Sequence, residues 1–150
     1  MADELVAITE TPLDVAAHEA AVAHAGAGAR VVFCGVVRDH DHGRDVTLLE
    51  YQGHPSAEAV LHQVVDEFRA EPHVLGIAVS HRVGTLAIGD VALVAAVATA
   101  HRGDAFGVCG RLVDEVKRRL PIWKRQVFAD GTDEWVNCPK AARSPDPGCR

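Results

Sequence analysis

Several features that would assign a common function are missing from this sequence. The signatures of P-loop and dinucleotide-binding proteins, of G-x-S-x-G hydrolases and of H-E-x-x-H metalloproteases do not occur. The four cysteines form no C-x-x-C pair and no regular spacing: Cys34, Cys109, Cys138 and Cys149. Neither a zinc site nor a disulfide framework is therefore predicted, and Cys34 and Cys109, in apolar runs, are interpreted as small buried hydrophobes.

Long hydrophobic runs are also missing. The longest, residues 91–100, is far shorter than a bilayer span. The start of the chain, residues 1–4, is acidic and does not resemble the basic beginning of a signal peptide. A cytoplasmic location is the expectation that follows.

The composition is that of one folded domain with an acidic balance. The chain has 150 residues, 48% hydrophobic and 24% charged, with a net charge of −6. A general nucleic-acid binder would need a broad basic surface, which this charge argues against. Yet six of the fifteen Lys and Arg residues fall within residues 111–125, beside two acids. This local basic patch suits a small anion better than a polymer.

Hydrophobic periodicity and turn residues predict an α+β fold. One mixed or antiparallel sheet should pack against about three helices, in a single domain over residues 1–138 with a Pro-rich, disordered tail at 139–150. Gly35, at the centre of a β-branched run, predicts a bulge or a close backbone approach. The expected helices are 12–24, 55–70 and 104–119; the expected strands are 29–39, 46–52, 74–84 and 91–102, with a turn at 85–90 and extended segments at 123–131 and 134–138.

Lys117 is the first candidate functional residue. At about 100° per residue it returns to within ~20° of an apolar stripe on its helix. An ammonium at that margin either snorkels over the apolar face or points into a pocket, and the helix geometry leaves both open. The expected stripe consists of Phe106, Cys109, Val113, Val116 and Leu120.

Lys124 is the second candidate, in an extended segment after Pro121. Alternate residues of a strand share a face, so Lys124 should point with Ile122 and away from Trp123. If the proline turn brings Lys124 near Lys117, burial and mutual repulsion would lower the pKa of either lysine and make it nucleophilic. The alternative is a solvated basic surface at a helix C-terminus, where cations are favoured.

Basic residues at strand ends are candidates for binding an anion. His101-Arg102 ends one strand just before a helix, Arg38 ends another, and arginines converging on one edge would form an anion pocket. A capping or hydrogen-bonded structural role is the alternative for His101, and His81-Arg82 is interpreted as mainly structural. The loop at His40 and His42 lacks the further ligands of a metal site, so no metal and no cofactor are predicted.

Three segments taken together resemble the large, catalytic subunit of molybdopterin synthase. They read ARVVFCGVVRDHDHGRDVTLLEY, SHRVGTLAIGDVALVAAVATAHRGDAF and DEVKRRLPIWK, and the resemblance covers roughly residues 5–137. It implies transfer of sulfur from the C-terminal thiocarboxylate of a small ubiquitin-like carrier subunit onto cyclic pyranopterin monophosphate, which forms the dithiolene of the molybdenum cofactor. It also implies a hammerhead-type α+β fold and a homodimer within a heterotetramer that holds one carrier at each end.

The resemblance also assigns residues. It implies that Lys117 and Lys124 are catalytic, that Arg38, His101 and Arg102 bind the substrate together with both lysines, and that the carrier's Gly-Gly tail reaches toward the helix of Lys117. The chain departs from the family at Gln126, where a glutamate is usual, and in the Gln-Gly-His-Pro stretch at 52–55. A charge partner for Lys124 is therefore not evident from the sequence.

Two other functions compete with the sulfurtransferase. A non-catalytic module could bind a small phosphorylated ligand or a partner's C-terminal tail through backbone donors and arginines. A lysine Schiff-base lyase is the third candidate. An essential lysine at position 117 would distinguish an enzyme from a binding module, because a module could use arginine there instead.

Overall fold

The computed structural model describes residues 5–136 of the chain. The predicted tail at 139–150 and the end of the predicted extended segment 134–138 lie outside the described residues. Three helices occur within the described range, α1 (Val15–Ala21), α2 (Ala57–Arg69) and α3 (Arg102–Arg119), and none of them is long and apolar enough to cross a membrane. The predicted α+β class with about three helices is confirmed.

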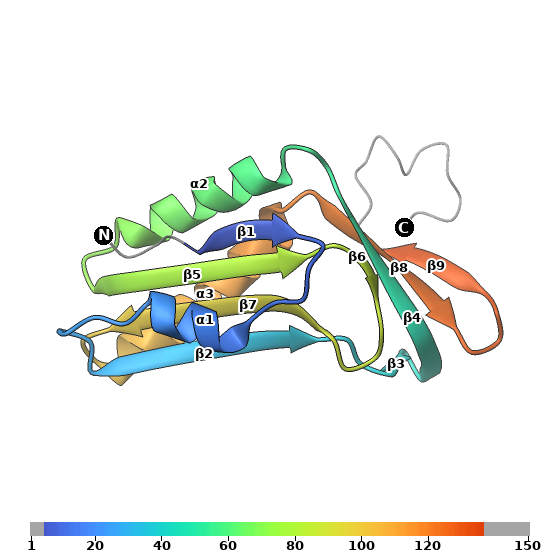
Figure 1. The fold of residues 1–150 in the computed structure, drawn as a ribbon, viewed down its shortest axis with the longest axis horizontal. Coiled ribbons are helices and arrows are strands. Elements are labelled where there is room, and N and C mark those ends of the chain that lie inside the picture. Colours follow the sequence, from blue (N-terminus) through green and yellow to red (C-terminus); the bar gives the residue numbers. More distant parts are fainter. Residues whose placement is uncertain (1–4, 137–150) are drawn as a thin grey trace.

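The strands form two sheets that meet end to end (Figure 1). The first has the order β1-β5-β7-β2, with β1 parallel to β5 and the other pairs antiparallel, so this sheet is mixed as predicted. The sequence predicted one sheet, but the chain forms two, because the remaining strands pair around β4 and β8 instead of joining β2 or β1. The second has the order β3-β4-β8-β9, with β6 also paired to β4. Their bounds are β1 Val6–Thr9, β2 Ala29–Val36, β3 His40–Asp41, β4 Arg44–Gly53, β5 Val74–Arg82, β6 Gly84–Leu86, β7 Val91–Thr99, β8 Ile122–Phe128 and β9 Asp133–Val136.

Strand β7 carries the core because both of its faces are covered. Its successive side chains alternate between two clusters, with Ala95 and Val97 packed in the large core of α2 and α3 and Ala96 and Ala98 packed against α1. A strand covered on both faces reads as a continuous apolar run, which explains the sequence VALVAAVAT. The strand thus runs through the centre of the core from Val91 to Thr99, and the segments that follow its two ends lie far apart.

Helix α1 lies close to β5 because the strand offers small and polar partners there. The buried His18 donates from Nδ1 to the Asp14 carbonyl at 2.6 Å and pairs through Nε2 with the Ser80 hydroxyl at 2.7 Å. Gly76 faces Val22 at the end of the helix, where a Cβ atom would lie 3.0 Å from the Val22 backbone. A side chain at position 76 would therefore be tight against the backbone of Val22.

The structure corrects three details of the sequence prediction. Strand β1 was not predicted, since four residues carry too little periodicity. Thr85 and Leu86, expected in a turn, pair with β4 as β6, and the turn begins at Ala87. Phe106 was expected in the apolar stripe of α3, but it is 64% exposed, because Ala105, Val108 and Leu112 form the buried side with Cys109 and Val116. The bulge predicted at Gly35 is confirmed between Gly35 and Val36.

The contact at Gly76 generates a stability prediction. Gly76→Ala should destabilise the fold by about 1–3 kcal/mol, because the new methyl group pushes against the backbone of Val22. Gly53→Ala is the matched control, since its Cβ would meet neighbours only at the ordinary distance of 3.6 Å. Urea unfolding of both variants measures the difference. Equal stabilities would show that α1 can retreat without cost.

Candidate functional site

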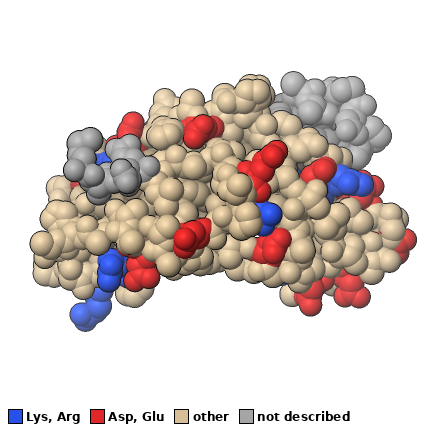
Figure 2. All heavy atoms as spheres, viewed as in Figure 1, with Lys and Arg blue, Asp and Glu red and all other residues tan. Residues whose placement is uncertain are grey.

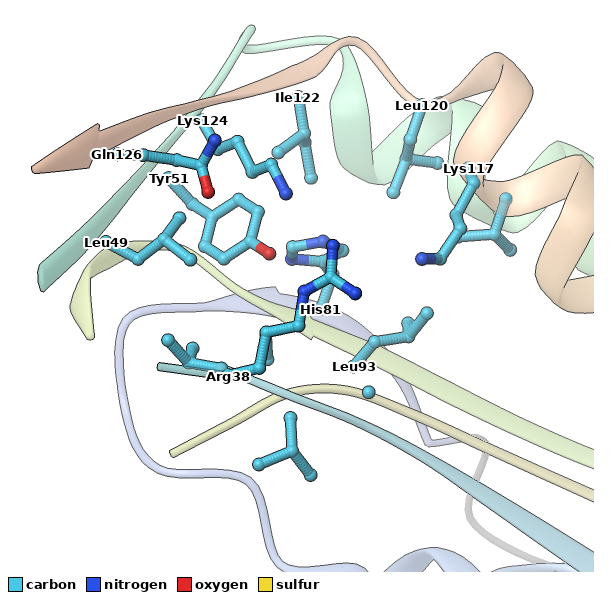
Figure 3. A pocket seen from close by; sticks show the side chains of 15 residues that line it. Arg38, Leu49, Tyr51, His81, Leu93, Lys117, Leu120, Ile122, Lys124 and Gln126 are labelled. Carbon is cyan, nitrogen blue, oxygen red and sulfur yellow. The ribbon is translucent and has the colours of Figure 1, made fainter. Parts of the chain in front are cut away.

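A cavity of about 320 Å³ lies where the first sheet, the second sheet and the end of α3 meet (Figure 3). Three cations line it, Arg38, Lys117 and Lys124, from three separate stretches of the chain. The rest of the lining is aromatic, apolar and amide: Gly35, Val36, Val37, Leu49, Tyr51, His81, Ala92, Leu93, Val116, Leu120, Ile122 and Gln126. The cavity is thus cationic, with apolar and aromatic side chains in part of its wall.

Lys117 is positioned by the last turn of α3. The helix ends at Arg119 because Leu120 is extended and Pro121 cannot continue the helical hydrogen bonding. From this turn the Lys117 side chain reaches into the cavity (Figure 3). Of the two placements that the sequence left open, the pocket is the one observed.

Lys124 is positioned by antiparallel pairing of β8 with β4. The register places Lys124 opposite Tyr51 and Gln126 opposite Leu49, and all four line the cavity. The predicted orientation of Lys124 with Ile122 is confirmed, while Trp123 points the other way and donates from Nε1 to Gln52 at 3.2 Å. Burial lowers the pKa of Lys124, the carboxylate of Asp41 raises it, and the charges of Lys117 and Arg38 lower it further.

Arg38 follows the bulged end of β2 and pairs with Asp41. Its Nη2 lies 3.1 Å from Asp41 Oδ1, and the other carboxylate oxygen accepts from Gln126 Nε2 at 2.8 Å. The hydrogen bond from Gln126 is the main reason that the pKa of Asp41 is lowered, and the charges of His42, Lys124 and Arg38 act in the same direction. Asp41 is therefore an anion beside the cations Arg38 and Lys124.

His81 is a lining residue that the sequence interpretation missed. Its Nδ1 lies 2.7 Å from the Arg82 carbonyl, which can only accept, so Nδ1 carries the proton. The ring meets Tyr51 edge to face, with centroids 4.9 Å apart. Burial lowers the pKa of His81 to about 4, opposed by the Arg82 carbonyl and reinforced by the charge of Lys117. His81 is a neutral imidazole whose Nε2 is free to accept.

Strand alternation was the signal that could have placed His81 in the cavity. Ile77 and Val79 share its face of β5 and pack into the main core beneath α3. Arg82 points to the other side, donates to the Glu10 carbonyl at 3.2 Å and pairs with Asp90 at 3.4 Å. The structural interpretation of the dipeptide thus fits Arg82 alone.

The basic run at 111–125 divides into paired arginines and pocket lysines. Four arginines form ion pairs with carboxylates at 2.6–2.8 Å: Arg111 with Glu71, Arg118 with Glu115, Arg119 with Glu67 and Arg125 with Asp133. Neither Lys117 nor Lys124 forms a salt bridge with any residue in the range 5–136. Acidic side chains are spread over the face in Figure 2, and few basic ones appear there. In the run 111–125, the positive charges without an ion-pair partner in the described part of the chain are thus those of Lys117 and Lys124, which line the cavity.

His101 and Arg102 lie away from this cavity in the same chain. They line a separate hollow with Gly28, Ala100 and Gly103, just beyond β7. Because β2 and β5 both run antiparallel to β7, their C-terminal ends lie beside the start of β7, whereas His101 follows its end. His101 lies eight positions after Leu93 of the cavity, roughly 26 Å along an extended chain at about 3.3 Å per residue. The expected convergence on one edge is not found within a single chain.

Within residues 5–136, no cluster of three or more His, Cys, Asp or Glu side chains is arranged to hold a metal ion. His40 pairs with its neighbour Asp39 at 2.9 Å, and His42 lies 3.9 Å from Asp41. These contacts join adjacent loop residues rather than a shared centre.

The α+β domain thus has a cationic, partly apolar cavity between two sheets, and such a cavity suits an anionic small molecule. The family model described as MoaE protein matches residues 8–119. The molybdopterin synthase catalytic subunits of Nostoc sp. and Thermoplasma volcanium are 35% and 36% identical to this chain, each over 90% of it and over 83% and 99% of their own lengths. The chain belongs to the MoaE family, which confirms the resemblance carried by the three segments.

Solved structures agree with this assignment. Molybdopterin synthase from Staphylococcus aureus is 32% identical, with a TM-score of 0.78 over 85% of this chain and 93% of that one. The MoaE protein from Burkholderia ambifaria is 31% identical, with a TM-score of 0.73 over 95% of this chain and 97% of that one. The hammerhead-type architecture of two joined sheets is thus that of the family.

The surroundings of His81 generate a prediction about protonation. NMR titration should show His81 neutral from pH 8 to pH 5, with Nδ1 carrying the proton, and protonated only near pH 4. An unfolded chain binds this proton below its ordinary pKa of 6.5, so acidification between pH 6.5 and 4 favours unfolding. A midpoint of His81 near 6.5 would contradict the buried, neutral imidazole.

Proposed function

We propose that this chain is the catalytic subunit of a molybdopterin synthase and works in the cytoplasm. It transfers sulfur from the C-terminal thiocarboxylate of a small ubiquitin-like carrier subunit to cyclic pyranopterin monophosphate, and so forms the dithiolene of molybdopterin. The observation that carries the proposal is the meeting of Lys117 and Lys124 in one cavity, from α3 and β8, in a chain of this family. Lysines that serve only as solvated surface would not be expected to line the same cavity.

The reaction requires positioned anions and stabilised charge. The thiocarboxylate sulfur attacks an electrophilic carbon of the pterin, and a C–S bond forms while a C–O bond to that carbon breaks and its oxygen leaves with a proton. Water then attacks the carrier's acyl carbon, the acyl C–S bond breaks, and the sulfur stays on the pterin while the carrier leaves as a carboxylate. Two such rounds complete the dithiolene, so the intermediate remains bound while the carrier is exchanged. Both partners are anionic, and fixed cations lower the cost of bringing them together.

The side chains in the cavity suit these steps. Lys117, at its margin, meets the carrier tail and the pterin and stabilises the charge that develops as sulfur is transferred. Lys124, deeper on β8, assists through its charge or its proton. Arg38 binds the anionic substrate at the third side of the cavity. The neutral Nε2 of His81 adds a hydrogen-bond acceptor to the same wall.

His101 and Arg102 can serve this cavity only from a second copy of the chain. We therefore propose a homodimer in which the His101 end of one protomer lies at the Lys117 end of the other. The open face of α3 supports this, since Gly103, Gly107 and Gly110 have empty space where a Cβ would lie and Phe106 is exposed beside them. The neighbouring β2 is an edge strand of its sheet in the described part of the chain. With one carrier at each end, the assembly is a heterotetramer.

Single-turnover sulfur transfer tests the function. Purified protein is mixed with thiocarboxylated carrier and cyclic pyranopterin monophosphate, and dithiolene product is measured. Lys117→Ala should lose about 100-fold in rate with carrier binding intact, and Lys124→Ala should lose roughly 10-fold, because each removes a cation that stabilises transferred charge. Arg118→Ala is the matched control, since Arg118 adjoins Lys117 but points outward to Glu115. A folded wild type that binds carrier and makes no product would be a binding module instead.

Mixed dimers test the shared site. Lys117→Ala and Arg102→Ala proteins should each be inactive, but a co-expressed mixture should recover about a quarter of wild-type activity. Half of the dimers formed at random are mixed, and one of the two sites in each mixed dimer is intact. Two Lys117→Ala partners carrying different tags provide the control that recovers nothing. A mixture as inactive as its parents would place Arg102 outside the cavity.

A further inference from the structure

Asp41 is a carboxylate with both oxygens engaged at the edge of the cationic cavity. Oδ1 accepts from Arg38 at 3.1 Å and Oδ2 accepts from Gln126 at 2.8 Å, and the side chain is only 14% exposed. Two directional bonds to a shielded carboxylate fix its position and keep it ionised. Asp41 is therefore a fixed negative charge, unlike the exposed acids of the same loop.

Gln126 links Asp41 to the strand that bears Lys124. It is 3% exposed and lies two residues after Lys124 on β8, so both side chains project from the same face into the cavity. An amide can donate to a carboxylate but supplies no charge of its own. The family resemblance leads to the expectation of a glutamate at position 126. This chain has a glutamine there, and its amide donates to the Asp41 carboxylate of β3.

The other groups around Lys124 do not supply a negative charge. Lys117 from α3 and Arg38 from the end of β2 repel its ammonium group, and Tyr51 and His81 are uncharged walls. Burial raises the pKa of Tyr51, so its phenol stays protonated, and His42 near Asp41 adds no negative charge. Of the groups acting on Lys124, Asp41 is the one that favours its charged form.

Of the neighbouring acids, Glu134 of β9 stands opposite Gln126 on the face that Lys124 shares, but it is not among the charges that shift the pKa of Lys124. The others face elsewhere. Glu50 stands opposite Arg125 in the β4–β8 pair, on the face away from Tyr51 and Lys124. Asp39 is 76% exposed and pairs with His40. Removing either charge would leave the surroundings of Lys124 unchanged.

We propose that Asp41, held by Gln126, is the positioning residue that keeps Lys124 protonated and Arg38 directed at the cavity. The Asp41–Gln126 pair thus supplies from β3 the charge that a glutamate at position 126 would supply from β8. The inference rests on the proposed function for its catalytic meaning, whereas the position of Asp41 follows from its hydrogen bonds to Arg38 and to Gln126, two residues after Lys124 on β8.

The experiment exchanges the acid and the amide. Asp41→Asn removes the charge, and Asp41→Asn with Gln126→Glu restores it across the same hydrogen bond with the direction of donation reversed. Asp39→Asn is the matched control, removing an exposed carboxylate two residues away. The chain contains three lysines, so NMR of protein labelled at the lysine ε-carbon resolves the signal of Lys124.

The expected results have a definite sign. Because Asp41 raises the pKa of Lys124, Asp41→Asn should lower that pKa by about one unit, and the rate of sulfur transfer should fall about tenfold, with the basic limb of its pH profile moved to lower pH. The double variant should return the pKa of Lys124 to within about half a unit and recover most of the rate. Asp39→Asn should behave as wild type.

Two results would overturn the inference. One is an unchanged pKa of Lys124 in Asp41→Asn, and the other is a double variant that recovers neither the pKa nor the rate. If Asp41→Asn does not fold, the double variant decides alone, through its Lys124 pKa. A wild type without sulfur transfer would reject the proposed function, whereas the NMR titration of the free protein would still decide the role of Asp41.

Discussion

Antiparallel pairing between β4 and β8 is the constraint on which the candidate site depends. It sets Tyr51 opposite Lys124 and Leu49 opposite Gln126, so one face of a two-stranded ribbon supplies much of the cavity wall. A slip of one residue would turn Lys124 outward and bring Trp123 inward. Pro121 makes this pairing possible, because it ends α3 where the chain must reverse and begin β8. Lys117 and Lys124 line the same cavity because α3 ends at Arg119 and because the register of β8 with β4 turns Lys124 toward the end of that helix.

The different fates of arginine and lysine in one basic segment follow from their chemistry. The arginines between 111 and 125 bind surface carboxylates, mostly through two nitrogens, as the planar guanidinium favours. The two lysines face the cavity, where a compact ammonium group on a flexible stem can change its pKa with its surroundings. Acidic side chains therefore neutralise the arginines of this segment at the surface, and the lysines leave the cavity positively charged.

Local patterns in the sequence were enough for much of this outcome. The three helices, the bulge at Gly35 and the orientation of Lys124 with Ile122 depend on neighbours in the chain, and the three segments were specific enough to identify the family. What failed depends on partners far away in the chain. Phe106 lies outside the buried stripe because the sheet and α2 select a different side of α3. Asp41 enters the site through a contact with Gln126 that no local pattern encodes, and the relative direction of β2 and β7 separates Arg38 from Arg102.

The length of β7 has a consequence for the rate of the reaction in the cell. Nine strand residues, eight of them buried, hold the two ends of β7 apart, so one folded chain cannot close a site that needs groups from both ends. Under the proposed arrangement, the fraction of working sites follows the association equilibrium of the subunits. Diluting the protein would then lower its activity per molecule, and cofactor production would respond more steeply than linearly to the amount of this chain that the cell makes.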